Sequence, residues 1–218
     1  MNDPLYGDHV RIAGGGVETV GLDNLGQQEL RLVCPPSLID AGLQYAQTLV
    51  AYVHESDHRI VSGETVACGS WMLRFVEASD GVLEAEEADL PSGEYVPGAS
   101  NALLYWMQQH EVCAAAGTAF DPFGLNEQIA ASMDLMTDDS EAIIEGVRYS
   151  ARPGRVALYL QGPAFDGDFD RMRVHHAYHV MEKHPQIMPY LGLPAGYCFF
   201  TNGKVWFEAD LLDGGAES

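Results

Sequence analysis

The run His-Glu-Ser-Asp-His at residues 54–58 has the spacing that comes nearest to a catalytic motif in this chain. On a helix, histidines four residues apart face the same way and can bind zinc, while the glutamate between them polarises a zinc-bound water. Asp57 places a charge where such a metalloprotease helix is uncharged, no third ligand follows, and the next residues favour a strand. We therefore expect ordinary histidines at an exposed helix end. The alternative is a small zinc-dependent hydrolase using His54, Glu55 and His58.

Other patterns that bind cofactors or support nucleophilic catalysis are incomplete. The glycines at residues 14–16 are neither preceded by a strand nor followed by Gly-Lys-Ser/Thr, and no Gly-x-Ser-x-Gly or Gly-x-Gly-x-x-Gly occurs. His175, His179 and Glu182 share one edge of a predicted helix without a fourth ligand, so a solvated or partner-contacting edge is expected. The sequence predicts no cofactor and no catalytic residues.

The chain is strongly acidic. Thirty-two acidic residues against eleven basic ones give a formal net charge of −21. Such a field repels nucleic acids and anionic membranes, and it accelerates the capture of a basic protein partner. Solubility, or adaptation to a salty habitat, would explain the same charge without a partner.

Two predicted acidic loops place this charge next to aromatic residues. Aromatic anchors among charged residues suit a protein-binding surface, although a solvated face would have the same composition. The second loop lacks the spacing and the terminal glutamate of a calcium-binding EF-hand. The predicted partner-binding residues are Glu84, Glu86, Glu87, Asp89, Glu94 and Tyr95 in the first loop and Asp166, Asp168 and Asp170 in the second, with Phe165 and Phe169 beside the latter and Asp138, Asp139 and Glu141 between the two loops in sequence.

The C-terminal part of the chain predicts a helix, a turn and a hairpin. Val174, Ala177, Tyr178 and Met181 have the spacing of an apolar stripe along a helix, which the prolines at 185 and 189 would end. Residues 197–201 and 204–208 then flank Asn-Gly, a pair that favours a tight type I′ hairpin.

Strand and helix patterns alternate over the rest of the chain. A strand at 29–34 precedes a Pro-Pro-Ser sequence that opens a helix, a second helix is capped by Ser100 or Asn101, and a third covers 126–136. Further predicted strands cover residues 59–67, 71–78, 82–87, 142–150 and 155–161, the last two pairing with each other. Residues 84–97 are predicted as an acidic loop. These elements predict an α+β fold with antiparallel or mixed sheets and packed helices.

A weak repeat suggests two related α+β halves. Residues 71–76 and 156–161 each lead through an acidic loop into an amphipathic helix, although two such units also resemble each other by chance. On this division, residues 1–28 form a flexible lead-in, 29–123 the first half, 124–212 the second half and 213–218 a tail.

The cysteines and the apolar runs favour a cytoplasmic protein. The four cysteines are scattered among apolar residues without a C-x-x-C pair, which favours buried, reduced thiols. No run approaches the roughly 18 apolar residues that a membrane span requires. The N-terminal residues lack the basic and apolar regions of a signal peptide.

The sequences Pro-Gln-Ile-Met-Pro-Tyr-Leu from residue 185 and Leu-Pro-Ala-Gly-Tyr-Cys-Phe from residue 193 carry a family resemblance. Over about 30 C-terminal residues, the chain resembles a bacterial domain of unknown function found among immunity proteins of polymorphic toxins. The acidic loop at 166–170 is similar to one in that family. The Gly-Trp strand and the Ser-Gly-Asp-Glu loop sequence of the family are absent here. The resemblance implies a protein that binds and neutralises a cognate secreted toxin. With the acidic charge, we expect a basic toxin such as a nuclease, and no catalysis.

Overall fold

The computed structural model describes residues 7–56, 58–137 and 142–212. Two compact units, Met1–Met107 and Gln108–Ser218, each contain one sheet and at least one helix, which confirms the predicted α+β class. The sequence placed the division near Phe123, whereas the units divide within helix α2 (Ser100–Ala116). That the halves are related stays a prediction. Residues 1–6 of the lead-in, the tail at 213–218, and Asp138, Asp139 and Glu141 lie outside the described residues.

The sheet of the first unit has seven strands. Six follow the order β1-β2-β3-β6-β5-β4, and β7 also pairs with β6. All neighbours are antiparallel except β3 and β6, which are parallel because α1 and two strands intervene in the chain. The elements are β1 (Val10–Ala13), β2 (Gly16–Thr19), β3 (Leu30–Val33), α1 (Ile39–Glu55), β4 (Thr65–Cys68), β5 (Trp71–Glu77), β6 (Leu83–Asp89) and β7 (Glu94–Pro97).

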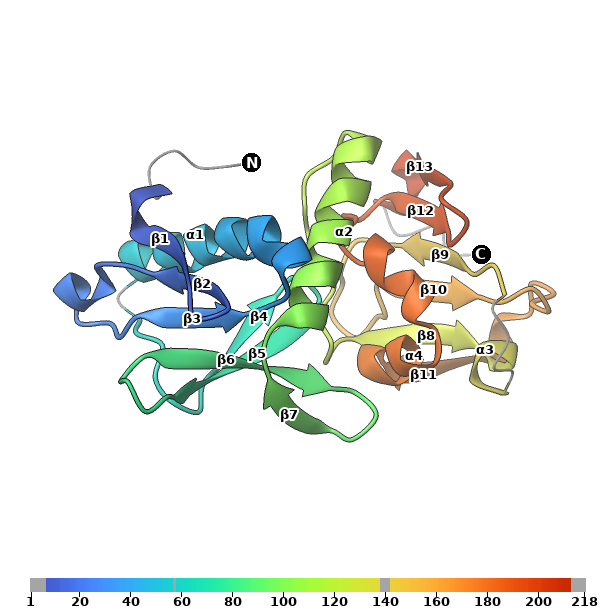
Figure 1. Ribbon diagram of the computed structural model, residues 1–218. Helices are drawn as coiled ribbons and strands as arrows, with labels where there is room; N and C mark the ends of the chain where they lie inside the picture. The colour runs from blue at the N-terminus through green and yellow to red at the C-terminus, as the bar shows by residue number, and fades with distance from the viewer. Residues whose placement is uncertain (1–6, 57, 138–141, 213–218) are drawn as a thin grey trace. The chain divides into compact units, whose positions relative to one another are not determined.

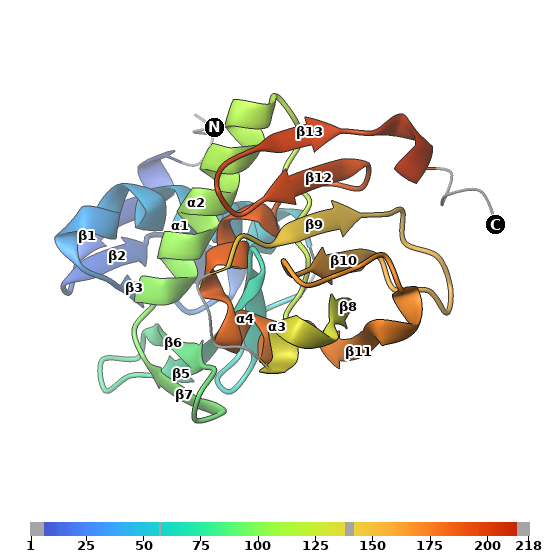
Figure 2. The ribbon, with the colours of Figure 1, turned by 90° about the vertical axis from the view of Figure 1, so that its right-hand side faces the viewer.

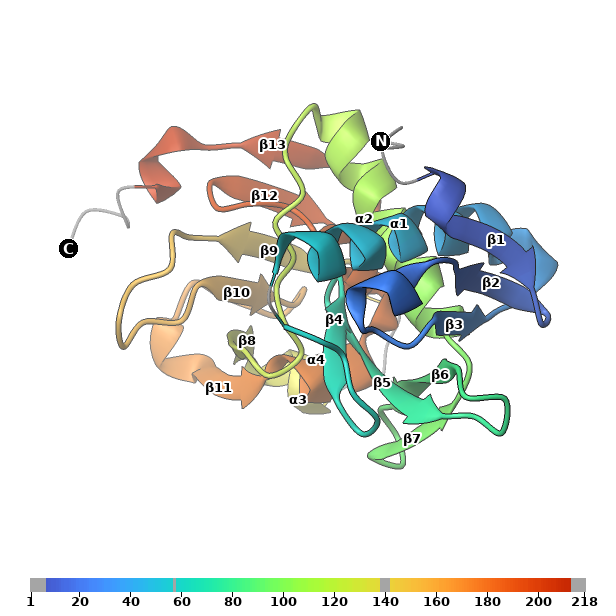
Figure 3. The ribbon, with the colours of Figure 1, turned by 90° about the vertical axis from the view of Figure 1, so that its left-hand side faces the viewer.

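Helix α1 forms the core of the first unit with this sheet. The short 3-10 turn Pro36–Leu38 leads into it, as the Pro-Pro-Ser sequence predicted. Its buried side includes Tyr45, Leu49 and Val53, and the helix packs on β1, β2 and β3 (Figures 1 and 3).

The predicted flexible lead-in is wrong for the residues that the structure describes, because β1 and β2 form a hairpin there. Gly14 and Gly15 connect the strands and have φ angles of 61° and 81°. Two consecutive positive φ angles are the requirement of a type I′ turn, which glycine meets without strain. The glycine run is therefore a structured turn.

The predicted strand at 59–67 is reduced to β4, since Arg59 and Ile60 make side-chain contacts instead. The Ile60 N–H donates to Gln27 Oε1 at 2.8 Å, and Gln27 Nε2 donates back to the Ile60 carbonyl at 3.0 Å. The Arg59 guanidinium donates to the carbonyls of Leu25 and Val53 at 2.9 and 3.2 Å. These bonds take the place of strand pairing.

The sheet of the second unit has six strands in the order β11-β8-β10-β9-β12-β13, seen in this sequence in Figure 2. Only β8 and β10 are parallel. The elements are β8 (Gln128–Ser132), α3 (Met133–Thr137), β9 (Glu145–Arg148), β10 (Leu158–Gln161), β11 (Met172–His176), α4 (Ala177–Lys183), β12 (Tyr197–Phe200) and β13 (Val205–Phe207). Two 3-10 helices, η4 (Phe169–Arg171) and η5 (Pro185–Tyr190), precede β11 and follow α4.

Two predicted helices of this unit are partly strand. The predicted helix at 126–136 is β8 followed by the short α3, and the predicted stripe starting at Val174 begins in β11, so that α4 starts only at Ala177. Strands β8 and β11 pair with each other along their length. Pairing between segments distant in sequence outweighs the local period.

Inward-facing residues of this sheet pack under α4 and η5. Leu158, Leu160 and Phe199 are almost fully buried, and Phe199 stacks on Tyr190 of η5 with ring centroids 4.6 Å apart. The imidazole of His184, at the end of α4, lies 2.6 Å from the carbonyl oxygen of Leu135 in α3. This contact joins α3 to the C-terminal end of α4 on the side of the sheet that the helices cover.

The predicted hairpins β9–β10 and β12–β13 are both present, but the second turn differs from the prediction. A type I′ turn needs a positive φ at Asn202, and among the described residues only glycines have one. The Gly203 N–H donates to the Phe200 carbonyl at 3.0 Å, and Gly203 has φ 101°. A four-residue turn that ends in a left-handed glycine therefore closes this hairpin. No helix within the described residues is long and apolar enough to cross a membrane.

Candidate partner-binding surface

The first predicted acidic set lies on the paired strands β6 and β7, so the prediction of a loop at 84–97 is wrong. Cross-strand register places Arg31 of β3 opposite Glu84 and Arg74 of β5 opposite Glu86. Arg31 lies 3.5 Å from Glu84, and Arg74 Nε donates to Glu86 at 2.9 Å. Both carboxylates are neutralised within the sheet, where opposite charges face each other across strands.

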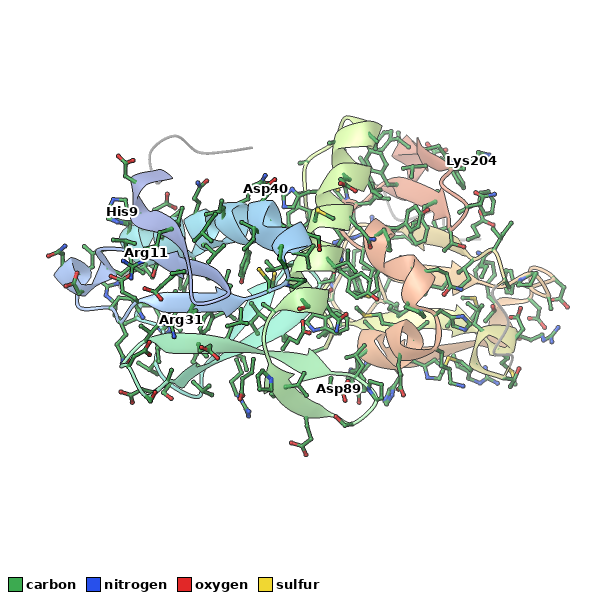
Figure 4. All side chains as sticks on the ribbon, in the orientation of Figure 1. His9, Arg11, Arg31, Asp40, Asp89 and Lys204 are labelled. Atoms are coloured by element: carbon green, nitrogen blue, oxygen red, sulfur yellow. The ribbon has the colours of Figure 1, made fainter. Side chains whose placement is uncertain are left out.

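Arg31 continues this row of charges across the sheet. Its guanidinium donates to Glu18 at 2.8 Å and to Asp80 at 2.7 Å, while Arg11 donates to the other oxygen of Glu18 at 2.5 Å. Figure 4 labels both arginines on this sheet. Burial alone would raise the pKa of Glu18, but the hydrogen bonds from the two arginines outweigh it and lower that pKa. The Glu18 carboxylate is therefore held in its charged form by the two arginines.

Glu87 points to the opposite side of β6 and is only 5% exposed. Its carboxylate accepts hydrogen bonds from the backbone N–H of Ala102 at 2.9 Å and from the side-chain amide of Asn101 at 3.1 Å. Burial raises the pKa of Glu87, although these bonds act in the other direction. The residue caps the start of α2 and is inaccessible to a partner.

The other members of the first set lie near the turn of the β6–β7 hairpin. Asp89 accepts a hydrogen bond from the Ser92 hydroxyl, and Glu94 is exposed. The ring of Tyr95 lies under the Arg74 guanidinium, 4.4 Å from ring centroid to Cζ. Asp89, Glu94 and the buried Glu87 are therefore the carboxylates of this set without an arginine partner among the described residues, and of these three only Asp89 and Glu94 lie outside the core.

The second acidic set lies in the connection from β10 to β11 and is exposed throughout. Asp166 pairs with Arg171 at 2.9 Å and accepts the N–H of Asp168 at 3.2 Å. Asp168 in turn accepts the N–H of Asp170 at 3.0 Å. The backbone hydrogen bond from Asp168, with Arg171, lowers the pKa of Asp166. Side chain-to-backbone bonds thus order the loop while the charges of Asp168 and Asp170 face solvent.

Four aromatic rings connect this loop to the sheet. Edge contacts link Tyr149 to Tyr159 (5.3 Å between centroids), Tyr159 to Phe169 (6.5 Å) and Phe169 to Phe165 (5.6 Å). Phe169 is 59% exposed, and the other three are half-buried. We call these four residues the aromatic row. The sequence drew attention to the two phenylalanines and missed the two tyrosines.

The tyrosines of the row lie on the sheet face opposite Phe199 and η5. Register aligns Tyr159 with Val147, Val147 with Cys198, and Cys198 with Trp206 on this face. Toward the other edge, Tyr159 aligns with Ala130, which aligns with Val174, itself 54% exposed. Alternation along each strand directs these side chains to the face opposite Leu158, Leu160 and Phe199, although Cys198 and Ala130 on it are buried. We call this side the outer face.

Carboxylates and one lysine surround the outer face. Burial, with Glu208 and Glu145 nearby, raises the pKa of the Cys198 thiol to about 12. Trp206 Nε1 donates to Glu208 at 2.8 Å, and Lys204, labelled in Figure 4, lies 4.8 Å from the Trp206 ring centroid. The surface can therefore offer rings and carboxylates together, the combination that protein interfaces use around a few anchors.

Residues 108–208 match the family model of the Imm33-like domain. The match includes every strand of the second sheet, the acidic loop and the aromatic row. It extends well beyond the 30 residues over which the sequence resembled immunity proteins, and the second unit is accordingly similar to an immunity-protein domain. Searches of curated proteins and of solved structures found no match.

The zinc-site residues lie in the first unit, outside the Imm33-like match, and do not converge. Helix α1 ends at Glu55, and Ser56 is extended, so His58 is not one turn beyond His54. The His58 ring instead lies 2.5 Å from Glu64, while the His54 ring packs against His9 with centroids 5.5 Å apart. No group of three or more His, Cys, Asp or Glu within the described ranges could hold a metal ion.

The histidines near α4, inside the Imm33-like match, lie on two different elements. His175 belongs to β11, whereas His179 and Glu182 belong to α4, so the predicted common helix edge is wrong. His179 contacts Tyr178 with ring centroids 4.0 Å apart. Burial, with His179 nearby, lowers the pKa of His175. These residues connect the edge strand to the helix.

Proposed function

We propose that this protein is an immunity protein that binds and neutralises a cognate toxin without catalysing a reaction. The observation that carries the proposal is the Imm33-like match over residues 108–208. This segment contains an exposed loop of carboxylates joined to aromatic rings, a combination suited to binding another protein. The proposal places the protein in the cytoplasm, where a toxin would reach its target.

We assign the toxin-binding role to the second acidic set in preference to the first. Glu84 and Glu86 pair with arginines of their own sheet, and Glu87 is buried under α2. Asp168 and Asp170 are exposed next to Phe169. A charge already paired in the free protein gains little binding free energy from a partner. The unpaired carboxylates of the second set can therefore contribute more to toxin binding.

A basic toxin fits this surface and the charge of the whole chain. A net charge of −21 would steer a basic protein toward the acidic loop and raise the association rate at low ionic strength. In a nuclease, the carboxylates would take the places of substrate phosphates in the active-site cleft. Binding to the active-site cleft would then be sufficient to neutralise the toxin.

Co-expression with the toxin tests the proposal. Wild-type protein should restore growth, whereas the double variant Asp168→Asn/Asp170→Lys should lose most of the protection. Asparagine at 168 can still accept the N–H of residue 170, so the loop keeps its turn while the charge changes.

The matched control is Asp89→Asn/Glu94→Lys on the β6–β7 hairpin, which makes the same change of charge in the first unit. It should protect as well as wild type. Full protection by the loop variant would contradict the electrostatic mechanism, and failure of the wild-type protein to bind or protect would contradict the immunity function.

A further inference from the structure

The aromatic row has the geometry of a stacking surface for a planar cation. Tyr149, Tyr159, Phe169 and Phe165 follow one another at centroid distances of 5.3, 6.5 and 5.6 Å. Phe169 presents the largest exposed fraction of the row, 59%. A ring face exposed to water attracts a guanidinium group through its quadrupole and through stacking.

Carboxylates lie at both ends of this row. Asp168 and Asp170 flank Phe169 in the chain, and their side chains are exposed. At the other end, the Glu208 N–H donates to the Gly196 carbonyl at 2.8 Å, and the Gly196 N–H donates at 2.8 Å to the carbonyl of Arg148, the residue before Tyr149. A cation stacked on the row would therefore also meet a carboxylate.

The chain itself contains an arginine bound in this way. In the first unit, Arg74 donates to Glu86 at 2.9 Å while its Cζ lies 4.4 Å from the centroid of Tyr95. The guanidinium forms an ion pair along its edge and stacks through its face, which a lysine ammonium cannot do. The ring and the carboxylate are thus both satisfied by one internal arginine.

The cation–π contacts found among the described residues lie over Tyr95, Phe123, Phe200 and Trp206, which are rings outside the aromatic row. Lys204 lies over Trp206 and Phe200, at 4.8 and 5.5 Å from the ring centroids, and so covers rings outside the row. Arg171 pairs with Asp166. The Arg173 guanidinium donates to the backbone carbonyl of Asp170 at 2.7 Å, which leaves the exposed carboxylates of Asp168 and Asp170 beside Phe169 for a partner.

We propose that the aromatic row binds an arginine-bearing segment of the partner, with a guanidinium stacked on Phe169 or Tyr159 and paired with Asp168 or Asp170. The inference rests on the proposed function, since the partner is the toxin, and adds the chemistry that is recognised. The row selects arginine over lysine, because stacking and the forked ion pair act together only with a guanidinium.

Two synthetic peptides of equal length and charge test this choice, one with arginines and the other with lysines spaced by glycines. Each is titrated into the isotope-labelled full chain, and affinities are taken from the amide resonances of Tyr159 and Phe169. The arginine peptide should bind about fivefold more tightly at these positions, as expected for one cation–π contact. Phe169→Leu should remove that preference.

Tyr95→Leu is the matched control, because it removes a ring that the chain's own Arg74 covers. It should leave the preference for arginine at Tyr159 and Phe169 intact. Equal affinities of the two peptides for wild type, or an unchanged preference in Phe169→Leu, would overturn the inference.

Toxin co-expression separates this inference from the immunity function. Rescue by Phe169→Leu as complete as that by wild type would overturn the role of the row and leave the immunity function standing. Failure of wild type to rescue would overturn the immunity function, while the peptide preference would still support the stacking surface.

Discussion

The carboxylate of Glu87 caps helix α2 by accepting the backbone N–H of Ala102 at 2.9 Å. Glu87 comes from β6, so a strand supplies the acceptor that the sequence assigned to Ser100 or Asn101. The Asn101 side chain donates to the same carboxylate at 3.1 Å. A residue predicted to contact a partner is thus part of the core of the first unit.

Replacing Glu87 by glutamine should change how stability depends on pH. Burial raises the pKa of Glu87 in the folded state, so the folded protein binds more protons than the unfolded chain between the unfolded and folded pKa values. The contribution of Glu87 is therefore complete below its unfolded pKa and falls as pH rises through this window. Glutamine can still accept from Ala102 and does not titrate.

Urea unfolding at several pH values from 4 upward, about one unit apart, measures this effect. The stability of Glu87→Gln relative to wild type should increase with pH. Glu94→Gln, at an exposed site on β7, controls for the removal of one charge. A relative stability of Glu87→Gln that is constant with pH, or that decreases, would show that the buried carboxylate does not titrate as described.

The Glu18→Gln variant should lose stability at neutral pH. Glu18 accepts hydrogen bonds from Arg11 and Arg31, and its side chain is 4% exposed. Removing its charge leaves Arg31 without its closest buried partner, for which we expect a loss of about 1–3 kcal/mol in the free energy of unfolding. Because its folded pKa is lowered, this stabilisation is present above the unfolded pKa and is lost as pH falls through the folded one.

Glu84→Gln is the control for this variant. Glu84 lies 3.5 Å from Arg31 and is more exposed, so its loss should cost about 0.5 kcal/mol or less. Calorimetry at pH 7 and near pH 3 compares the two. Equal losses for both variants at pH 7 would contradict the special role of Glu18.

Local signals in the sequence predicted α1 and the β9–β10 and β12–β13 hairpins correctly, but not the β1–β2 and β6–β7 hairpins. Turn residues adjoin each strand pair, and the Pro-Pro-Ser sequence fixes the start of α1. The failures at β8 and β11 share a cause. The spacing of Val174 in the sequence fits a helical apolar stripe, but in the structure Val174 pairs with Ala130, a residue far away in the chain. A period within one segment contains no information on such pairing.

The same limit applies to the candidate site. The sequence identified the carboxylates, yet only the register reveals that Glu84 and Glu86 face arginines while Glu87 faces the core. Alternation of Leu83 and Ala85 with acids favoured the strand predicted at 82–87, but the loop predicted from residue 84 onward overlapped it and missed the rest of β6 and β7. No comparable signal brings Tyr149 next to Tyr159, because their contact depends on how β9 pairs with β10.

Arg148, a mostly buried arginine of the second unit, contacts two backbone carbonyls and the exposed carboxylate of Asp121. Its guanidinium donates to the carbonyl of Asp121 at 2.5 Å, to that of Leu193, and to Asp121 Oδ2 at 3.2 Å. Lysine lacks this fork, so Arg148→Lys should lower the free energy of unfolding by about 1–3 kcal/mol. Asp121→Asn keeps the carbonyl contacts and should cost less. If chemical denaturation gave a larger loss of stability for Asp121→Asn than for Arg148→Lys, the Asp121 carboxylate, and not the carbonyls, would hold Arg148.

Gly146 faces Phe199 across β9 and β12, and a Cβ at that position would lie 2.1 Å from Cζ of Phe199. Phe199 cannot move easily, because it is 2% exposed and stacks on Tyr190. Gly146→Ala should therefore lower the free energy of unfolding by about 2–4 kcal/mol through overpacking. Chemical denaturation gives this value, and far-UV circular dichroism checks that the fold persists.

A double-mutant cycle identifies the clash as the cause. Phe199→Leu alone removes part of the ring stack and should also destabilise, by about 1–3 kcal/mol. If the Cβ of residue 146 strikes the ring, the double variant Gly146→Ala/Phe199→Leu should be more stable than the sum of the single losses implies, by about 1 kcal/mol or more. Strict additivity would mean that Gly146→Ala acts through the backbone of β9 instead of through Phe199.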